Sequence, residues 1–203
     1  MRVLKRRLIK CAVFTAASLP LLSLANGVFF GALAADPYPP SIQATGLWSM
    51  RLLLLGLTLT PFSRATGWAW PIEIRRMIGL FAAFYGFLHL LIWMKDYGFD
   101  WVFIIGETVG RAYLAIGFVA VLLLVPLAAT SMDAAVRWLG ARGWRRLHWL
   151  VFPAVALAYL HFEMIGRFTR AEALIDALLI LGLFGWRLVR WAQRALRPRA
   201  QYP

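Results

Sequence analysis

Long apolar stretches alternate with short charged segments along almost the whole chain. A helix that crosses the hydrocarbon layer of a bilayer, about 30 Å thick, needs roughly 20 mostly apolar residues. Six stretches approach this requirement, with predicted bounds of 8–30, 45–61, 73–94, 110–129, 145–164 and 171–191. The pattern predicts an all-α integral membrane protein, a six-helix bundle that forms one domain over residues 1–203.

The connections between these stretches are short and leave no room for a soluble domain. Residues 36–41 read DPYPPS, and their three prolines predict a loop between the first two helices.

Composition supports lipid as the solvent for the apolar surface. Of 203 residues, 62% are hydrophobic, and the mean hydropathy is +0.69. Soluble domains are closer to half apolar. The single cysteine, Cys11, excludes an intrachain disulfide and a metal site built on several cysteines.

The N-terminus shares features with a secretory signal peptide. Basic residues precede an apolar run that ends in Ala-Leu-Ala at 32–34. The run is about twice as long as a usual signal-peptide core, and cleavage would leave five spans. We therefore expect the first helix to be retained.

The net charge of +13 is distributed unevenly between the two ends of the predicted bundle. Seventeen cations fall on one side: Arg2, Lys5, Arg6, Arg7, Lys10, Arg64, Arg75, Arg76, Arg137, Arg142, Arg145, Arg146, Arg187, Arg190, Arg194, Arg197 and Arg199. The other side carries four cations and seven of the nine acids: Lys95, Arg111, Arg167, Arg170, Asp36, Asp96, Asp100, Glu107, Glu163, Glu172 and Asp176. By the positive-inside rule both termini are cytoplasmic, and a nucleic-acid role is not needed to explain the charge.

All three histidines of the chain, His89, His148 and His161, fall within predicted spans. His89 and His161 lie on helices that run in the same direction, each roughly 22–24 Å from the cytoplasmic end. Two histidines at equal depth are suited to bind a b-type haem as axial ligands. The alternative is a pair of hydrogen-bonded packing histidines. Zinc is disfavoured because no third ligand accompanies them.

Residues near these histidines allow two interpretations each. Small residues at 79, 82, 83 and 86 leave one side of the third helix shallow, which suits a flat cofactor or close helix packing. Arg75 and Arg76 are candidates for pairing with haem propionates, or for anchoring the chain at the cytoplasmic surface.

His148 is the candidate ligand of a second haem nearer the cytoplasm. It lies about 20 Å from His161 and, on an ideal helix, points about 140° away from it, although Pro153 between them could kink the helix. Its counterpart position on the third helix falls near Arg75 and Arg76, where no histidine stands.

Several motifs resemble the MsrQ (YedZ) family, the haem-binding membrane subunits of a methionine sulfoxide reductase system. The motifs follow in the same order from about residue 30 to 165: Ala35-Asp36-Pro37, Thr60-Pro61-Phe62-Ser63-Arg64, Arg75-Arg76 with Gly79, Leu88-His89-Leu90, Arg111-Ala112-Tyr113-Leu114, Ala129-Thr130-Ser131, Arg146-Leu147-His148 and His161. That family belongs to the ferric reductase-like transmembrane domains. Those relatives usually carry two histidines on the third helix, where this chain has one.

The resemblance implies a membrane cytochrome b in the bacterial inner membrane. It implies electron transfer from the quinone pool, or from a separate flavin reductase, through haem b to a periplasmic molybdopterin reductase, MsrP, that repairs oxidised envelope proteins. FMN is implied as a second cofactor by resemblance only. The chain would then be an electron-transfer subunit without catalytic residues of its own.

Two other functions remain open. One is a ferric or cupric reductase of the same fold with a different acceptor. The other is a small proton-coupled transporter, for which Arg51 alone in the second span gives weak support.

Overall fold

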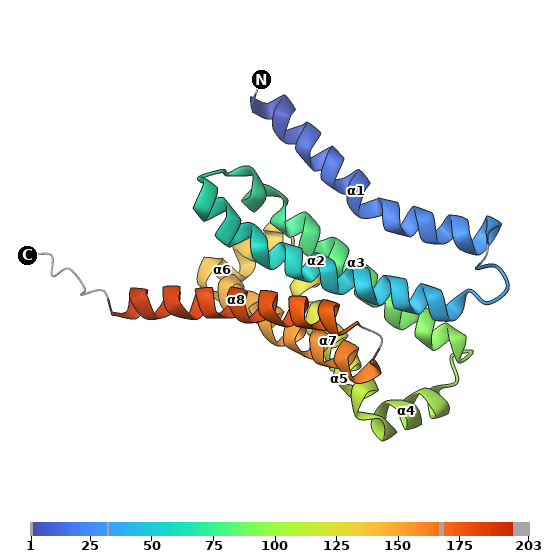
Figure 1. Ribbon diagram of the computed structural model, residues 1–203. Helices are drawn as coiled ribbons and strands as arrows, with labels where there is room; N and C mark the ends of the chain where they lie inside the picture. The colour runs from blue at the N-terminus through green and yellow to red at the C-terminus, as the bar shows by residue number, and fades with distance from the viewer. Residues whose placement is uncertain (1, 32, 167–168, 197–203) are drawn as a thin grey trace, which may run out of the picture.

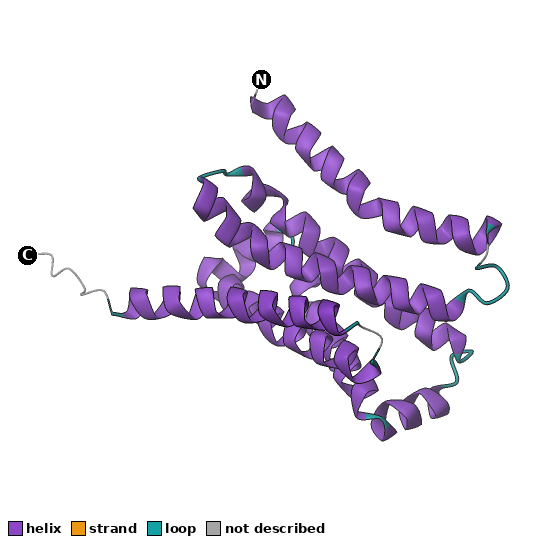
Figure 2. Ribbon diagram, in the orientation of Figure 1, coloured by secondary structure: helices purple, strands orange, loops and turns teal. Residues whose placement is uncertain are grey.

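The protein is helical throughout the part of the chain that the structure describes, residues 2–31, 33–166 and 169–196 of a computed structural model (Figure 2). The elements are α1 (Arg2–Phe30), α2 (Tyr38–Thr66), α3 (Trp70–Asp96), α4 (Trp101–Gly110), α5 (Ala112–Ala129), α6 (Asp133–Leu147), the 3₁₀ turn η1 (His148–Leu150), α7 (Val151–Ile165) and α8 (Arg170–Ala195). Of the residues used above for topology, Ala32, Arg167, Arg197 and Arg199 lie outside the described residues, and only the backbone is described at Arg2 and Arg194.

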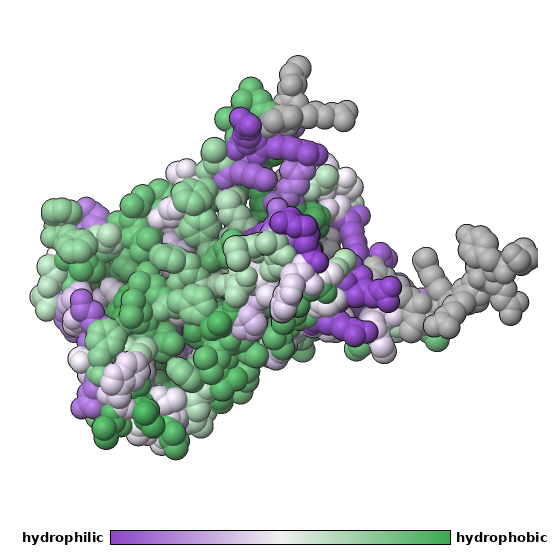
Figure 3. Space-filling model, turned by 180° about the vertical axis from the view of Figure 1, so that it is seen from behind, coloured by the Kyte–Doolittle hydropathy of each residue, from purple (hydrophilic) through white to green (hydrophobic). Residues whose placement is uncertain are grey.

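The long helices run back and forth along the molecule, and two shorter ones lie at its opposite ends (Figure 1). α4 follows α3 at one end, and α6 follows α5 at the other end (Figure 1). In the space-filling view, an apolar surface covers the middle of the molecule, and polar residues gather towards the end from which the C-terminus leaves (Figure 3). This distribution is that of a bilayer-embedded bundle.

Each predicted span has a helix in the structure, and the loop predicted at residues 36–41 is confirmed at residues 36–37 and wrong at residues 38–41. α2 begins at Tyr38, so that Pro39 and Pro40 lie in its first turn. The first-turn N–H groups of a helix have no intrahelical acceptor, and proline therefore costs nothing there. The other end of α2 stops at Gly67, whose left-handed φ of 73° closes the helix before α3.

Two of the connections between predicted spans contain helices. Ten residues form α4, which is too short to span, and Asp100 caps it by accepting hydrogen bonds from the N–H groups of Val102 and Phe103. The other, α6, contains the arginines predicted between the fourth and fifth spans, and Gly140 kinks it with a positive φ of 68°. α4 is apolar but shorter than a span, and α6 is rich in arginine, so neither meets the requirement for a membrane-spanning helix.

Five segments among the described residues are long and apolar enough to cross a membrane: Leu4–Phe30, Tyr38–Thr66, Trp70–Asp96, Ala112–Ala129 and Asp133–Ile165. The predicted sixth span corresponds to α8, which is 26 residues long but carries charges towards both ends. Its uncharged stretch covers only residues 177–186, between Asp176 and Arg187. Six spans therefore remain a prediction, and five are supported by length and composition.

The core lies mainly between α2 and α3. Met50, Leu57 and Tyr85 are among its largest fully buried side chains. Across this contact Ser49 Oγ donates a hydrogen bond of 2.8 Å to the carbonyl oxygen of Ala82. The predicted small-residue face is buried at Ala82, Ala83 and Gly86 but exposed at Gly79. Most of that face serves close helix packing.

Tyr85 on α3 contributes two hydrogen bonds to the contact between α1 and the bundle. The Tyr85 hydroxyl accepts a hydrogen bond of 3.1 Å from the N–H of Leu21 and donates one of 2.8 Å to the carbonyl oxygen of Ala17. An undisturbed helix would pair these two groups of α1 with each other. Pro20 lies beside them, and α1 changes direction along its length (Figure 1). The inserted hydroxyl satisfies backbone groups that a bend would separate.

Candidate functional site

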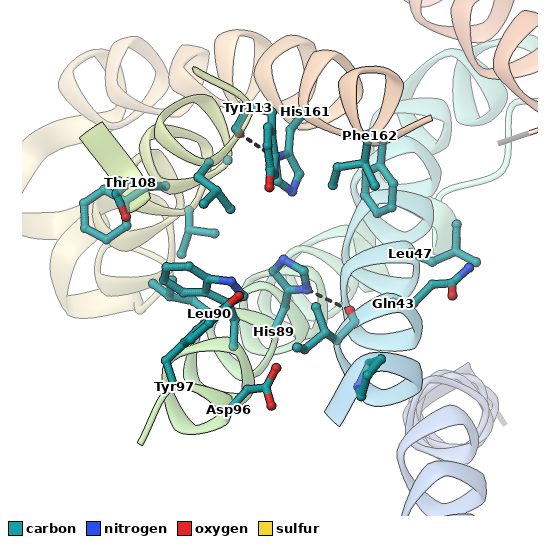
Figure 4. Close-up of a pocket in the computed structure, with 18 of the residues that line it drawn as sticks. Gln43, Leu47, His89, Leu90, Asp96, Tyr97, Thr108, Tyr113, His161 and Phe162 are labelled. Atoms are coloured by element: carbon teal, nitrogen blue, oxygen red, sulfur yellow. Dashed lines mark hydrogen bonds between the residues drawn. The ribbon is translucent and has the colours of Figure 1, made fainter. Parts of the chain in front are cut away.

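His89 and His161 face each other inside the bundle. They come from α3 and α7, and their ring centroids lie 6.2 Å apart with the ring planes at 80° to each other. Both rings point into the same space from opposite sides (Figure 4). The prediction that these two histidines share one depth is confirmed.

Each of the two rings is held by a backbone carbonyl of a neighbouring helix. Nδ1 of His89 lies 2.8 Å from the carbonyl oxygen of Ile42 on α2. Nδ1 of His161 lies 2.7 Å from the carbonyl oxygen of Tyr113 on α5 (Figure 4). A carbonyl oxygen can only accept, so each Nδ1 carries the proton and each Nε2 of the neutral ring keeps its lone pair. This is the arrangement that orients a metal-bound histidine.

The spacing of the two rings suits a single metal ion between them. An imidazole nitrogen bonds a transition metal at about 2 Å and lies about 1 Å from its own ring centroid. Two axial imidazoles on one iron therefore place their centroids about 6 Å apart, close to the 6.2 Å observed. Among the described residues no cluster of three or more histidine, cysteine or carboxylate side chains is placed to hold a metal. The remaining iron ligands would have to come from a porphyrin.

The space around the pair also suits a bulky cofactor. A cavity of about 370 Å³ opens beside the two rings, within the size range of ligand pockets. Its walls are largely apolar and aromatic, and include Trp93, Phe118 and Phe162. A second cavity of about 40 Å³ touches the same two histidines and extends along α2 towards Leu53. The residues present therefore fit haem b.

A charged pair at the corner between α4 and α5 lies beside the Tyr113 side chain. Arg111 bonds Glu107 with an Nε to oxygen distance of 2.7 Å and contacts the Tyr113 hydroxyl at 3.4 Å. The Tyr113 hydroxyl and the Glu107 carboxylate raise the pKa of the exposed Arg111 above its ordinary value. The Tyr113 ring lies nearly parallel to that of His161, with centroids 6.2 Å apart. Tyr113 therefore contacts His161 through both its backbone and its ring.

His148 lies apart from this pair, at the start of η1. Its ring stacks on Trp144 with centroids 3.8 Å apart, and its Nδ1 lies 3.2 Å from the Trp144 carbonyl oxygen. The 3₁₀ turn over His148–Leu150 precedes Pro153, which cannot donate to the carbonyl four residues earlier. The helix is thus irregular just before Pro153, in the segment where a kink was expected.

Arg75 and Arg76 lie within electrostatic reach of His148 and not beside the His89–His161 pair. Arg76 forms an ion pair with Asp133 at the start of α6. No ion pair of Arg75 occurs in the described part of the chain. The predicted candidates thus form two groups: His89 with His161, and His148 with the two arginines.

Sequence comparisons agree with this architecture. Residues 45–159 match the family described as "Ferric reductase like transmembrane component". A "Protein-methionine-sulfoxide reductase heme-binding subunit MsrQ" from Rhodospirillum rubrum is 41% identical over 96% of this chain and 94% of its own length. The chain belongs to the MsrQ family.

Other members of the MsrQ family show similar coverage. The protein of Ralstonia nicotianae is 40% identical over 96% of this chain and 90% of its own length. That of Xanthomonas campestris pv. campestris is 44% identical over 82% of this chain and 75% of its own length. No solved structure matches the chain significantly. Membership in the MsrQ family and the apolar helices make this a multi-pass membrane protein.

The groups that hold the two rings were not predicted from the sequence. Ile42 belongs to none of the motifs, and Tyr113 appears only as part of the motif at residues 111–114. Both act through main-chain oxygens, and Gly46 and Gly117 pack against the rings without a side chain. No pattern of side-chain types identifies such contacts in a single sequence.

Proposed function

We propose that this protein is a membrane cytochrome b that binds one haem b through Nε2 of His89 and Nε2 of His161. The observation that carries the proposal is the facing pair of rings, each held at Nδ1 by a backbone carbonyl. Haem, when bound, supplies one-electron redox chemistry, and the chain supplies its ligands and surroundings. The haem-binding description printed for the MsrQ relatives supports this assignment.

The proposed route carries electrons across the bacterial inner membrane from the cytoplasmic to the periplasmic side. We propose the quinone pool, or a separate flavin reductase, as the donor and the periplasmic reductase MsrP as the acceptor. The name of the MsrQ relatives, subunits of a methionine sulfoxide reductase, supports such a partner. Repair of oxidised envelope proteins would follow from that partner's activity. We carry FMN over as a second cofactor from the family resemblance, without assigning a residue to it.

His148 is the proposed ligand of a second haem nearer the cytoplasm. Its stacking on Trp144 and the nearby charges of Arg75 and Arg76 support a site for an anionic cofactor at this level. Arg76 is already paired with Asp133, so Arg75 is the better candidate for a propionate partner.

A second candidate function is a ferric or cupric reductase with a different acceptor. The match to the ferric reductase-like family over residues 45–159 favours keeping this alternative. The two functions share the haem site and differ only in the acceptor.

Stopped-flow reoxidation distinguishes the acceptors. Dithionite-reduced protein, freed of excess reductant, is mixed with MsrP that carries its molybdopterin, in the presence and absence of methionine sulfoxide. We expect the reduced haem band to decay upon mixing and to decay completely when sulfoxide is present. An unchanged band with MsrP, together with rapid decay on addition of a ferric chelate, would favour the metalloreductase.

A further inference from the structure

Two glycines, Gly46 on α2 and Gly117 on α5, lie directly against the imidazole rings of His89 and His161. A Cβ atom at position 46 would stand 2.9 Å from Nδ1 of His89. A Cβ atom at position 117 would stand 2.6 Å from Nδ1 of His161 and 2.7 Å from its Cε1. These separations are far shorter than carbon and nitrogen atoms tolerate without a bond between them. Neither ring could keep its place beside an alanine.

Each glycine also lies four residues after the residue whose carbonyl oxygen holds the ring. Gly46 follows Ile42 by four residues, and Gly117 follows Tyr113 by four residues. In a helix the carbonyl of residue i points towards residue i+4. A missing side chain at i+4 therefore opens a path by which a ring from another helix reaches the second lone pair of that oxygen. The same contact occurs twice, on two different helices, one for each histidine.

We propose that Gly46 and Gly117 are positioning residues that set the orientation of the two axial imidazole planes. This inference rests on the proposed haem ligation by His89 and His161. Each glycine allows the bond from Nδ1–H to the carbonyl, and that bond fixes the rotation of the ring about its own axis. The two bonds together leave the planes at 80° to each other.

The angle between the planes has an electronic consequence. Nearly perpendicular axial imidazoles leave the two iron orbitals that interact with them close in energy. Ferric low-spin haem of this kind gives a highly anisotropic EPR signal with one large g value, whereas parallel planes give a rhombic signal with three resolved g values. The hydrogen bond at Nδ1 also makes the imidazole a stronger donor, which favours ferric over ferrous iron. Loss of the bond should raise the midpoint potential.

The test compares Gly46→Ala and Gly117→Ala in the full-length, haem-loaded protein in detergent. Controls are Gly56→Ala on α2, where the nearest atom would be 3.7 Å away, and Gly79→Ala on α3, where nothing lies within 4 Å. We expect the wild type and both controls to give the highly anisotropic signal. Both test variants should lose that signal in favour of a rhombic or high-spin one, and haem that stays six-coordinate should show a more positive potential.

A test variant with full haem content, an unchanged EPR signal and an unchanged potential would overturn the inference. Gly46→Ala is the milder change, so it decides the matter if Gly117→Ala fails to accumulate. If both test variants fail to fold while both control variants fold normally, the glycines serve packing alone, and the inference is also overturned. A wild-type protein without a low-spin bis-histidine signal would instead contradict the proposed ligation, whatever the glycine variants do.

Discussion

At the scale of single residues, main-chain carbonyls of neighbouring helices orient the rings of His89 and His161. His89 and His161 stood out because ionisable groups are rare within spans and because their depths agree. The main-chain carbonyls of Ile42 and Tyr113 hold the two rings, and every residue type has such a carbonyl. Their availability depends on which helix lies beside which ring, and this is settled only by tertiary packing.

The Tyr85 hydroxyl gives a prediction at this scale. Tyr85→Phe removes the group that serves both the Leu21 N–H and the Ala17 carbonyl. These groups can then bond each other only if α1 straightens. We expect the free energy of unfolding to fall by about 2 kcal/mol, since two hydrogen bonds with a usual net value of about 1 kcal/mol each are lost, and the orientation of α1 to change.

Cys11 makes the change in α1 measurable because it is the only cysteine and is exposed on this helix. A spin label there, paired with a second label at an introduced Ile72→Cys on α3, reports the distance between the two helices. That distance distribution should shift or broaden in Tyr85→Phe. Tyr97→Phe, at an exposed tyrosine, serves as the control. Identical distributions in all three proteins would rule out a role for the hydroxyl in holding α1.

At the scale of elements, hydropathy located every long helix and misjudged the ends and the connections. α2 starts at Tyr38, seven residues before its predicted span, and this start was missed because first turns rich in proline and polar residues do not raise hydropathy. α4 and α6 were missed because one is too short to span and the other is rich in arginine. Both follow directly from spans, at opposite ends of the bundle (Figure 1).

At the scale of the whole molecule, the charge pattern and the arrangement of the helices agree. The arginines of α6 and of the C-terminal part of α8 lie at one end, and the acids Asp96, Asp100 and Glu107 lie near α4 at the other. The His89–His161 cavity opens towards the acidic end, since Asp96 and Glu172 are among its lining residues. This end is the proposed periplasmic side, from which electrons would leave.

Reporter fusions test this orientation. A fusion after Pro203 should be fluorescent with a cytoplasmic reporter and inactive with a periplasmic phosphatase, because the basic ends stay in the cytoplasm. A fusion after Gly98, between α3 and α4, is the control for the opposite side of the membrane and should be active only with the phosphatase. The reverse pattern at both positions would place the His89–His161 cavity on the cytoplasmic side.

The central claim is that His89 and His161 together ligate one haem. Its most direct test is the haem content per protein, measured as the pyridine haemochromogen together with the optical spin state, in His89→Ala, His161→Ala and His148→Ala. We predict that the first two variants lose most of their haem or convert it from low-spin to high-spin. His148→Ala should keep the low-spin haem of the pair and lose at most a second, substoichiometric haem. A His148→Ala variant without haem, beside a fully loaded low-spin His161→Ala, would contradict the account and place the haem nearer the cytoplasm.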